Sequence, residues 1–196
     1  MDLISSNKKD KYMIPNNSKN KYIITFLSQY NINENITDEF ISIDSNIIES
    51  LDNIKNKKKY GQDKYINKII YDIGCQILLL KNSKIGITHF SLSDILVINE
   101  EIFLFFNNDR LFDLLENNEG IVNFDNIDFD SLFIPPEFKI SKKLKNFYYT
   151  TSFYSFAKLL LHLFKIDLKD ITYTQLFFFC ERCLDENPHK RHLLFI

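Results

Sequence analysis

Two side chains near the middle of the chain have the chemistry of a catalytic or metal-binding centre. His89 could act as a general base, because the pKa of an unperturbed imidazole lies near neutrality. Asp94 carries a carboxylate that could supply an oxygen ligand to a divalent cation. The structural alternative is that Asp94 caps or turns the backbone through local hydrogen bonds, as an aspartate before a strand commonly does. Both interpretations stay open, and we favour the structural one.

The pair Cys180-x-x-Cys183, followed by His189 and His192, contains four side chains of the kind that binds zinc. Five residues separate the two pairs, whereas a zinc finger needs about a dozen. Both cysteines also lie at helical spacing with Phe179, where a free cysteine behaves as a small apolar residue. We therefore expect a buried helix and no zinc site.

The stretch Tyr65–Val97 resembles the middle of a protein kinase. In these kinases a long helix leads into the catalytic loop H-R-D-L-x-x-x-N, and a strand follows. The catalytic positions differ here, since Ile87-Thr88-His89 stands in place of His-Arg-Asp and Asp94 in place of the metal-binding Asn. The apolar scaffold positions are kept, at Ile69, Ile70, Ile73, Ile77, Leu80, Ile85, Ile95, Leu96 and Val97.

Three further segments resemble kinase motifs and follow in the family's order. They are Ile134–Glu137 for A-P-E, Ser152–Ala157 for D-x-W-S-x-G, and Cys183–Arg191 for L-x-x-D-P-x-x-R. In kinases the Glu of A-P-E pairs with the late Arg, so the resemblance implies a structural ion pair between Glu137 and Arg191. The resemblance covers roughly residues 20–196.

The residues that phosphoryl transfer requires are missing. The 4 Gly are too far apart for G-x-G-x-x-G, and no strand Lys followed by a helical Glu can be placed. Counting along the predicted hairpin puts Phe106 at the D-F-G Asp position, and a phenyl ring cannot ligate Mg²⁺. The resemblance therefore implies a pseudokinase without catalytic residues, cofactor or metal, in which His89, Asp94 and Phe106 occupy degenerate catalytic positions.

Hydrophobic patterning predicts an α+β fold dominated by helices. We expect a flexible arm over 1–19, and over 20–45 a truncated amino-terminal lobe of about two paired strands, Lys21–Leu27 and Glu39–Ile43, with the hinge. A kinase-like C-terminal lobe is expected over 46–196. Its predicted elements are a helix capped by Asp44 or Ser45 that runs through Ile54, a helix over Asp63–Leu80, a hairpin of Asp94–Ile98 and Ile102–Phe106, an irregular acidic segment over Asn107–Leu132, a buried helix over Phe153–Phe164 and a last helix over Thr174–Leu184.

Composition limits the classes of partner. The 24 basic and 26 acidic residues leave a net charge of −2, which offers no electrostatic case for nucleic acid. No apolar run reaches the roughly 18 residues of a spanning helix, so no membrane association is expected. Three cysteines without a secretory leader suggest a cytoplasmic protein, and the abundance of Asn, Ile and Lys suggests an AT-rich genome, such as that of a large DNA virus.

The sequence thus predicts a catalytically inactive, kinase-like scaffold or regulatory module that binds a protein partner, such as a kinase or a kinase regulator. Asn107–Leu132 and the rim left by the reduced upper lobe are the expected contact surfaces. Two alternatives remain: an unconventional nucleotide-using enzyme completed by a partner chain, and an unrelated structural α+β domain.

Overall fold

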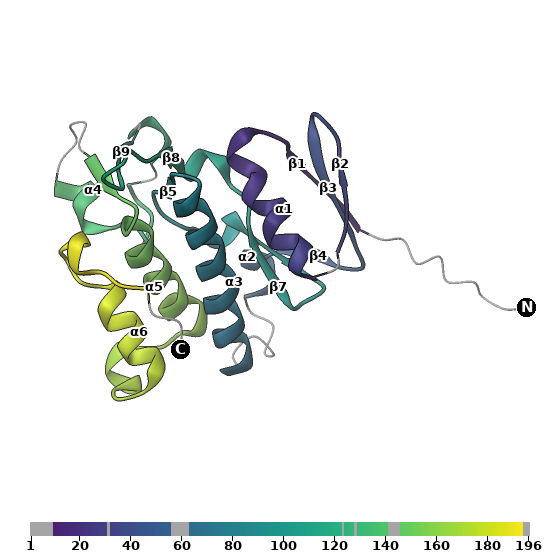
Figure 1. The fold of residues 1–196 in the computed structure, drawn as a ribbon. Coiled ribbons are helices and arrows are strands. Elements are labelled where there is room, and N and C mark those ends of the chain that lie inside the picture. The colour runs from purple at the N-terminus through teal and green to yellow at the C-terminus, as the bar shows by residue number, and fades with distance from the viewer. Residues whose placement is uncertain are drawn as a thin grey trace, which may run out of the picture.

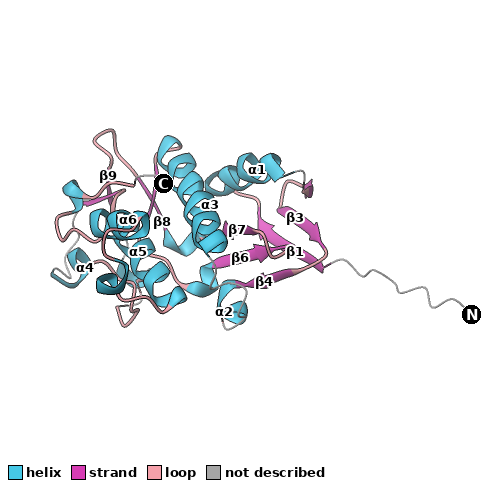
Figure 2. Cartoon of the chain, turned by 90° about the horizontal axis from the view of Figure 1, so that it is seen from below, coloured by secondary structure: helices cyan, strands magenta, loops and turns pink. Residues whose placement is uncertain are grey.

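The structure, a computed structural model, describes residues 10–30, 32–55, 63–122, 124–127, 129–140 and 146–193. It has the α+β composition that the hydrophobic pattern predicts, with six α-helices and small antiparallel sheets in the described residues. Most strands lie toward the N-terminal end of the molecule, and most helices form the larger part beside them (Figure 1, Figure 2).

The N-terminal part is a three-stranded antiparallel sheet covered by a helix. Strands β1 (Asp10–Pro15) and β2 (Asn33–Ile36) flank the central β3 (Phe40–Ser45), and helix α1 (Lys21–Leu27) connects β1 to β2. Three corrections follow. The segment 21–27 is a helix and no strand, the sheet has three strands where about two were expected, and residues 10–15 of the predicted arm form β1. Residues 1–9 of that arm lie outside the described residues.

Helix α1 forms because its apolar residues share one face. Tyr22, Ile23, Phe26 and Leu27 are buried, at positions one turn apart, and the helix packs on α3 (Asp63–Asn82). The side chain of Asn17 accepts hydrogen bonds from the backbone N–H groups that open the preceding 3-10 turn.

A second three-stranded sheet joins the two parts of the chain. Strand β6 (Ile95–Ile98) pairs with β4 (Ile48–Ser50) on one side and β7 (Ile102–Phe105) on the other. The β6–β7 hairpin confirms the predicted one. The helix expected to start at Asp44 or Ser45 is wrong in its boundary, since α2 (Leu51–Ile54) begins only after β4 and is capped by Ser50.

The predicted helix over Asp63–Leu80 is confirmed as α3, which leads into β5 (Ile85–Ile87). Strand β5 pairs with β8 (Leu111–Asp113), and β9 (Glu119–Ile121) pairs with β10 (Asn146–Tyr148). The segment expected to be irregular therefore contains two strands. The Phe112 ring lies against Gly86 and Gly120, where an added Cβ would come within 2.4 and 2.7 Å of it.

The remaining helices close the C-terminal part. They are α4 (Pro136–Ile140), α5 (Thr151–Phe164) and α6 (Gln175–Cys183), and the last two confirm the helices predicted there. Helix α5 packs against α6 and β5, and most of its residues are buried, Leu160 to 1 % exposure. One apolar core extends from the N-terminal sheet to α6, and a smaller one lies among β8, α4 and β10. Short 3-10 turns occupy Ser18–Asn20, Ser28–Tyr30, Leu92–Asp94, Asn108–Arg110, Phe124–Asn126, Leu168–Ile171 and Pro188–Lys190.

Candidate functional site

The loop between β5 and β6 carries the residues with catalytic potential, and it is buried. Thr88 and His89 are 3 % and 0 % exposed. The backbone N–H of Thr88 donates to the carbonyl of Arg110 at 2.9 Å, and the N–H of Phe90 donates to Oγ of Ser155 on α5 at 2.7 Å. The loop is thus anchored to the 3-10 turn Asn108–Arg110, which follows the hairpin, and to the central helix. A general base must reach a proton of its substrate, and the His89 imidazole lies in the protein interior.

Both carboxylate oxygens of Asp94 accept hydrogen bonds inside the fold. Oδ1 accepts from Nδ2 of Asn107 at 2.6 Å, and Oδ2 accepts from the backbone N–H of Ser91 at 2.8 Å. The guanidinium Nε of Arg110 lies 3.5 Å from Oδ2. Asp94 is 2 % exposed, and burial raises its pKa above the usual range, although Asn107 and Arg110 act in the opposite direction. The side chain therefore holds a turn together, and its charge faces the guanidinium of Arg110, where a metal ligand would face a metal ion.

The residue that meets Asp94 is one position later than counting along the hairpin suggested. Asn107, and not Phe106, points its amide at the carboxylate. The placement of Phe106 at the D-F-G Asp position, which comes from the kinase resemblance, stays a prediction. The Phe106 ring instead packs edge-on against Tyr12 of β1, with 5.5 Å between ring centroids. This contact joins the N-terminal sheet to the end of β7.

Sequence reasoning missed a set of polar side chains that hold the outer edge of β7. Asp72 Oδ2 accepts from the backbone N–H of Phe103, and Gln76 Oε1 accepts from that of Phe105. Gln76 also donates to the carbonyl of Phe103, and the Tyr22 hydroxyl donates to that of Phe105. These bonds satisfy backbone groups that an edge strand would otherwise leave unpaired. The available signal was the pair of polar residues one turn apart within the apolar α3.

The fully buried Asp72 is itself surrounded by donors. Its Oδ1 accepts from the Tyr30 hydroxyl and from Nζ of Lys68, each at 2.6 Å. Burial raises the pKa of Asp72, and the hydrogen bonds from Lys68, Tyr30 and the Phe103 N–H lower it by less. Asp72 is a structural junction between α3, β7 and the turn after α1.

The two residues named as an ion pair lie in contact. Arg191 donates to both carboxylate oxygens of Glu137, at 2.6 and 2.8 Å, and also to the carbonyls of Asp185 and Glu186. The guanidinium carbon lies 5.1 Å from the ring centroid of Tyr154 on α5. The pair therefore joins α4, the turn after α6 and the central helix.

The cysteines of α6 lie in the core. Cys180 and Cys183 are both 0 % exposed, and burial raises the pKa of the Cys180 thiol to about 12. The Cys183 thiol donates to the carbonyl of His192. Among the described residues there is no group of three or more His, Cys, Asp or Glu side chains placed to hold a metal ion.

Comparison with protein-family models and with curated proteins found no match for this chain. Within the described ranges, no helix has both the length and the apolar character needed to cross a membrane.

Proposed function

We propose that this chain is a catalytically inactive, kinase-like domain that acts by binding a protein partner. The observation that carries the proposal is that the Asp94 carboxylate is held by other groups of the fold. Its carboxylate, at the position of the metal-binding Asn in the resemblance, is bound by Asn107 and Ser91 and lies beside Arg110. A site that transfers a phosphoryl group holds Mg²⁺ with free oxygen ligands at these positions.

The order of elements supports a kinase-like C-terminal lobe. A long helix (α3) leads to a buried loop, a hairpin follows (β6–β7), and a short helix (α4) carries the Glu of the A-P-E-like segment. The central buried helix α5 comes next, and the chain then reaches Arg191, which pairs with Glu137. A bidentate contact between residues 54 positions apart is difficult to obtain from an accidental alignment of motifs.

The N-terminal part supports the loss of catalysis. In protein kinases a Lys on a strand pairs with a Glu on the following helix. Strand β1 is followed by α1, whose sequence KYIITFL contains no acidic residue. Tyr12 of β1 packs instead against Phe106. Among its described residues, this part of the chain covers the hairpin and shows no Lys–Glu ion pair of the kind that orients a nucleotide.

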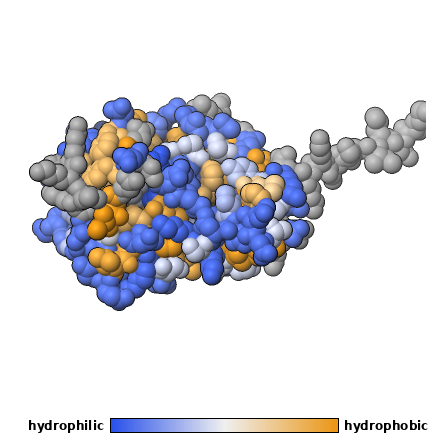
Figure 3. Space-filling view, turned by 90° about the horizontal axis from the view of Figure 1, so that it is seen from above, coloured by the Kyte–Doolittle hydropathy of each residue, from blue (hydrophilic) through white to orange (hydrophobic). Residues whose placement is uncertain are grey.

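Without phosphoryl transfer, the function left to such a fold is recognition. We propose an intracellular protein partner, and by analogy with the kinase family a kinase or a kinase regulator. Side chains of large apolar residues remain exposed on several elements, among them Met13 of β1, Ile121 of β9 and Tyr173 before α6. On the face drawn in Figure 3, apolar residues gather mainly on the side away from the N-terminal end.

The proposal is tested by thermal unfolding in the presence of millimolar ATP and Mg²⁺, since a ligand that binds the native state raises the melting temperature. We expect no shift with ATP, with Mg²⁺ or with both. The matched control is the exchange variant Asp94→Asn/Asn107→Asp, which keeps an amide–carboxylate pair and puts an Asn at the position that the resemblance gives to the metal-binding Asn. A Mg²⁺-dependent rise in the melting temperature of the natural chain would contradict the proposal and favour a nucleotide-using enzyme.

A further inference from the structure

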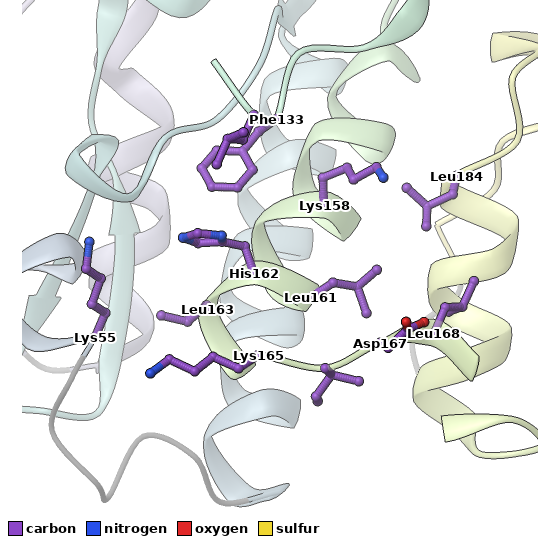
Figure 4. Close-up of a pocket in the computed structure, with 12 residues that line it drawn as sticks. Lys55, Phe133, Lys158, Leu161, His162, Leu163, Lys165, Asp167, Leu168 and Leu184 are labelled. Atoms are coloured by element: carbon purple, nitrogen blue, oxygen red, sulfur yellow. The ribbon is translucent and has the colours of Figure 1, made fainter. Parts of the chain in front are cut away.

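A pocket of about 730 Å³ opens beside the C-terminal half of α5 (Figure 4). Leu161 and Leu163 of α5 line one side, and Leu168 and Leu184 line the side toward α6. Phe133 closes one end, with its ring edge-on to His162 and 5.3 Å between ring centroids. The volume is in the range of pockets that take up side chains of a ligand or of a partner protein. The interior of the pocket is mainly aliphatic and aromatic.

The rim of the pocket is cationic. Lys55, Lys158 and Lys165 line it together with His162, and Asp167 is the one acidic residue in the lining. Figure 4 shows the ammonium groups of the lysines around the opening, on both sides of His162. A pocket whose interior is apolar and whose rim carries mainly one sign of charge discriminates between partners by charge.

The charges of this rim are largely uncompensated. Lys55 forms a salt bridge with Asp52 at 2.7 Å, but no salt bridge to Lys158 or Lys165 occurs in the part of the chain that the structure describes. The carboxylate of Asp167 accepts from the backbone N–H of Lys169, which commits it to the turn Leu168–Ile171. Among the described residues, the ammonium groups of Lys158 and Lys165 thus lie beside an apolar surface without a carboxylate partner, and that of Lys158 is 5.8 Å from the ring centroid of Tyr154.

An exposed apolar side chain extends the pocket outward. Leu132, next to Phe133, is 73 % exposed although it borders the pocket. An exposed leucine at the mouth of an apolar cavity gains free energy when a partner covers it, at roughly 25 cal/mol per Å² of apolar area. The pocket thus offers, at the same place, apolar contacts and two positive charges that have no carboxylate partner among the described residues.

We propose that this pocket is the docking site for a short acidic segment of a partner protein, in which Asp or Glu side chains flank a Leu, Ile or Phe anchor. The anchor enters the cavity lined by Leu161 and Leu184, and the carboxylates pair with Lys158 and Lys165. The inference rests on the proposed function as a binding module and names the surface and the partner chemistry. The residues that follow Lys55 in this chain offer no such acidic segment, because the sequence continues with Lys57, Lys58 and Lys59.

The test uses a displayed library of random 12-residue peptides, selected in parallel on the natural chain and on three variants. Lys158→Glu/Lys165→Glu reverses the rim, and Leu132→Ser removes the exposed leucine. The matched control is Lys21→Glu/Lys139→Glu, which makes the same change in net charge at two exposed lysines outside the pocket lining. Melting temperatures of all variants establish that each is folded.

We expect peptides enriched on the natural chain and on the control to contain Asp or Glu beside a large apolar residue, and to be lost on Lys158→Glu/Lys165→Glu. For one such peptide, measured by fluorescence anisotropy, the rim reversal should raise Kd at least tenfold and Leu132→Ser at least threefold, while the control stays within twofold. Added salt should weaken binding to the natural chain.

Two results would overturn the docking site: no peptide enriched on the natural chain, or enriched peptides whose Kd is unchanged by the rim reversal. Neither result touches the proposed loss of catalysis, which nucleotide titration tests separately. Conversely, a Mg²⁺-dependent response to ATP would remove the proposed function while a rim-dependent peptide would still identify this surface as a docking site.

Discussion

The guanidinium of Arg191 and the carboxylate of Glu137 meet in two parallel hydrogen bonds of 2.6 and 2.8 Å. Arg191 is 1 % exposed, and the Glu137 side chain is 16 % exposed. Because α4 follows the long segment after the hairpin and Arg191 follows α6, this contact ties two distant parts of the C-terminal chain to each other. The geometry is the fork-to-carboxylate arrangement that lysine cannot reproduce.

We predict that Glu137→Ala and Arg191→Ala each lower the free energy of unfolding by about 3–5 kcal/mol, because each leaves a largely buried charge without its partner. The double variant should cost much less than the sum of the two. Urea denaturation of the four proteins measures this coupling. Arg182→Ala on the exposed side of α6 is the control and should change stability by less than about 0.5 kcal/mol. Additive losses for Glu137 and Arg191 would mean that the contact contributes no coupling energy.

Helix α5 should determine whether the chain folds, since Leu160 at its centre is 1 % exposed. Truncation of a fully buried leucine removes its transfer free energy and leaves a cavity, so Leu160→Ala should cost about 2–5 kcal/mol. Lys158→Ala, on the same helix but at its partly exposed side, should cost well under about 1 kcal/mol. Guanidinium denaturation distinguishes the two, and equal small losses would show that α5 is peripheral to the stability of the fold.

The burial of Asp72 predicts an unusual pH dependence. Its pKa is raised in the folded chain, chiefly by burial, so the folded state holds this proton more tightly than the unfolded state. The Asp72 contribution to the free energy of unfolding should therefore fall as pH rises from about 4, the unfolded pKa, through the raised folded value. Compared with Asp72→Asn, which cannot titrate, the natural chain should lose relative stability as the pH rises from about 4 through the raised folded pKa of Asp72. Urea denaturation over this range provides the measurement, and a relative gain in stability with rising pH would contradict the assignment.

Hydrophobic periodicity was sufficient to predict the long elements of the fold. Helices α3, α5 and α6 and the β6–β7 hairpin each carry an apolar pattern that repeats over several turns or strand positions. In each of them either the helical period or the strand period therefore fits clearly better than the other. The segment Lys21–Leu27 is too short for its periodicity to distinguish a helix from a strand. Its β-branched and aromatic residues suit a strand, but the apolar surface of α3 stabilises the helix instead. Strand β1 was missed because its pairing partner β3 lies far along the chain.

The candidate site was predictable in its residue types and less so in its contacts. The positions of His89 and Asp94 follow from the spacing of a loop between two strands, whereas the end of β7 decides whether Phe106 or Asn107 faces Asp94. Strand ends are uncertain by a residue or two from sequence, and a shift of one residue reverses the side to which a side chain points. The polar junction at Asp72 was not anticipated, since it depends on donors from three elements that meet only in the folded chain.

The central claim, that Asp94 serves the fold and binds no metal nucleotide, is tested most directly by methyl NMR with Mn²⁺ and ATP. The unpaired electrons of Mn²⁺ broaden the signals of nearby groups, and Ile95 and Leu96 follow Asp94 directly in β6. The methyl groups of Val122, in the smaller core and outside the lysine-rimmed pocket, serve as the reference. We predict that millimolar Mn²⁺ and ATP broaden Ile95 and Leu96 no more than Val122. Selective, saturable broadening at Ile95 and Leu96 that is reversed by excess Mg²⁺-ATP would contradict the account.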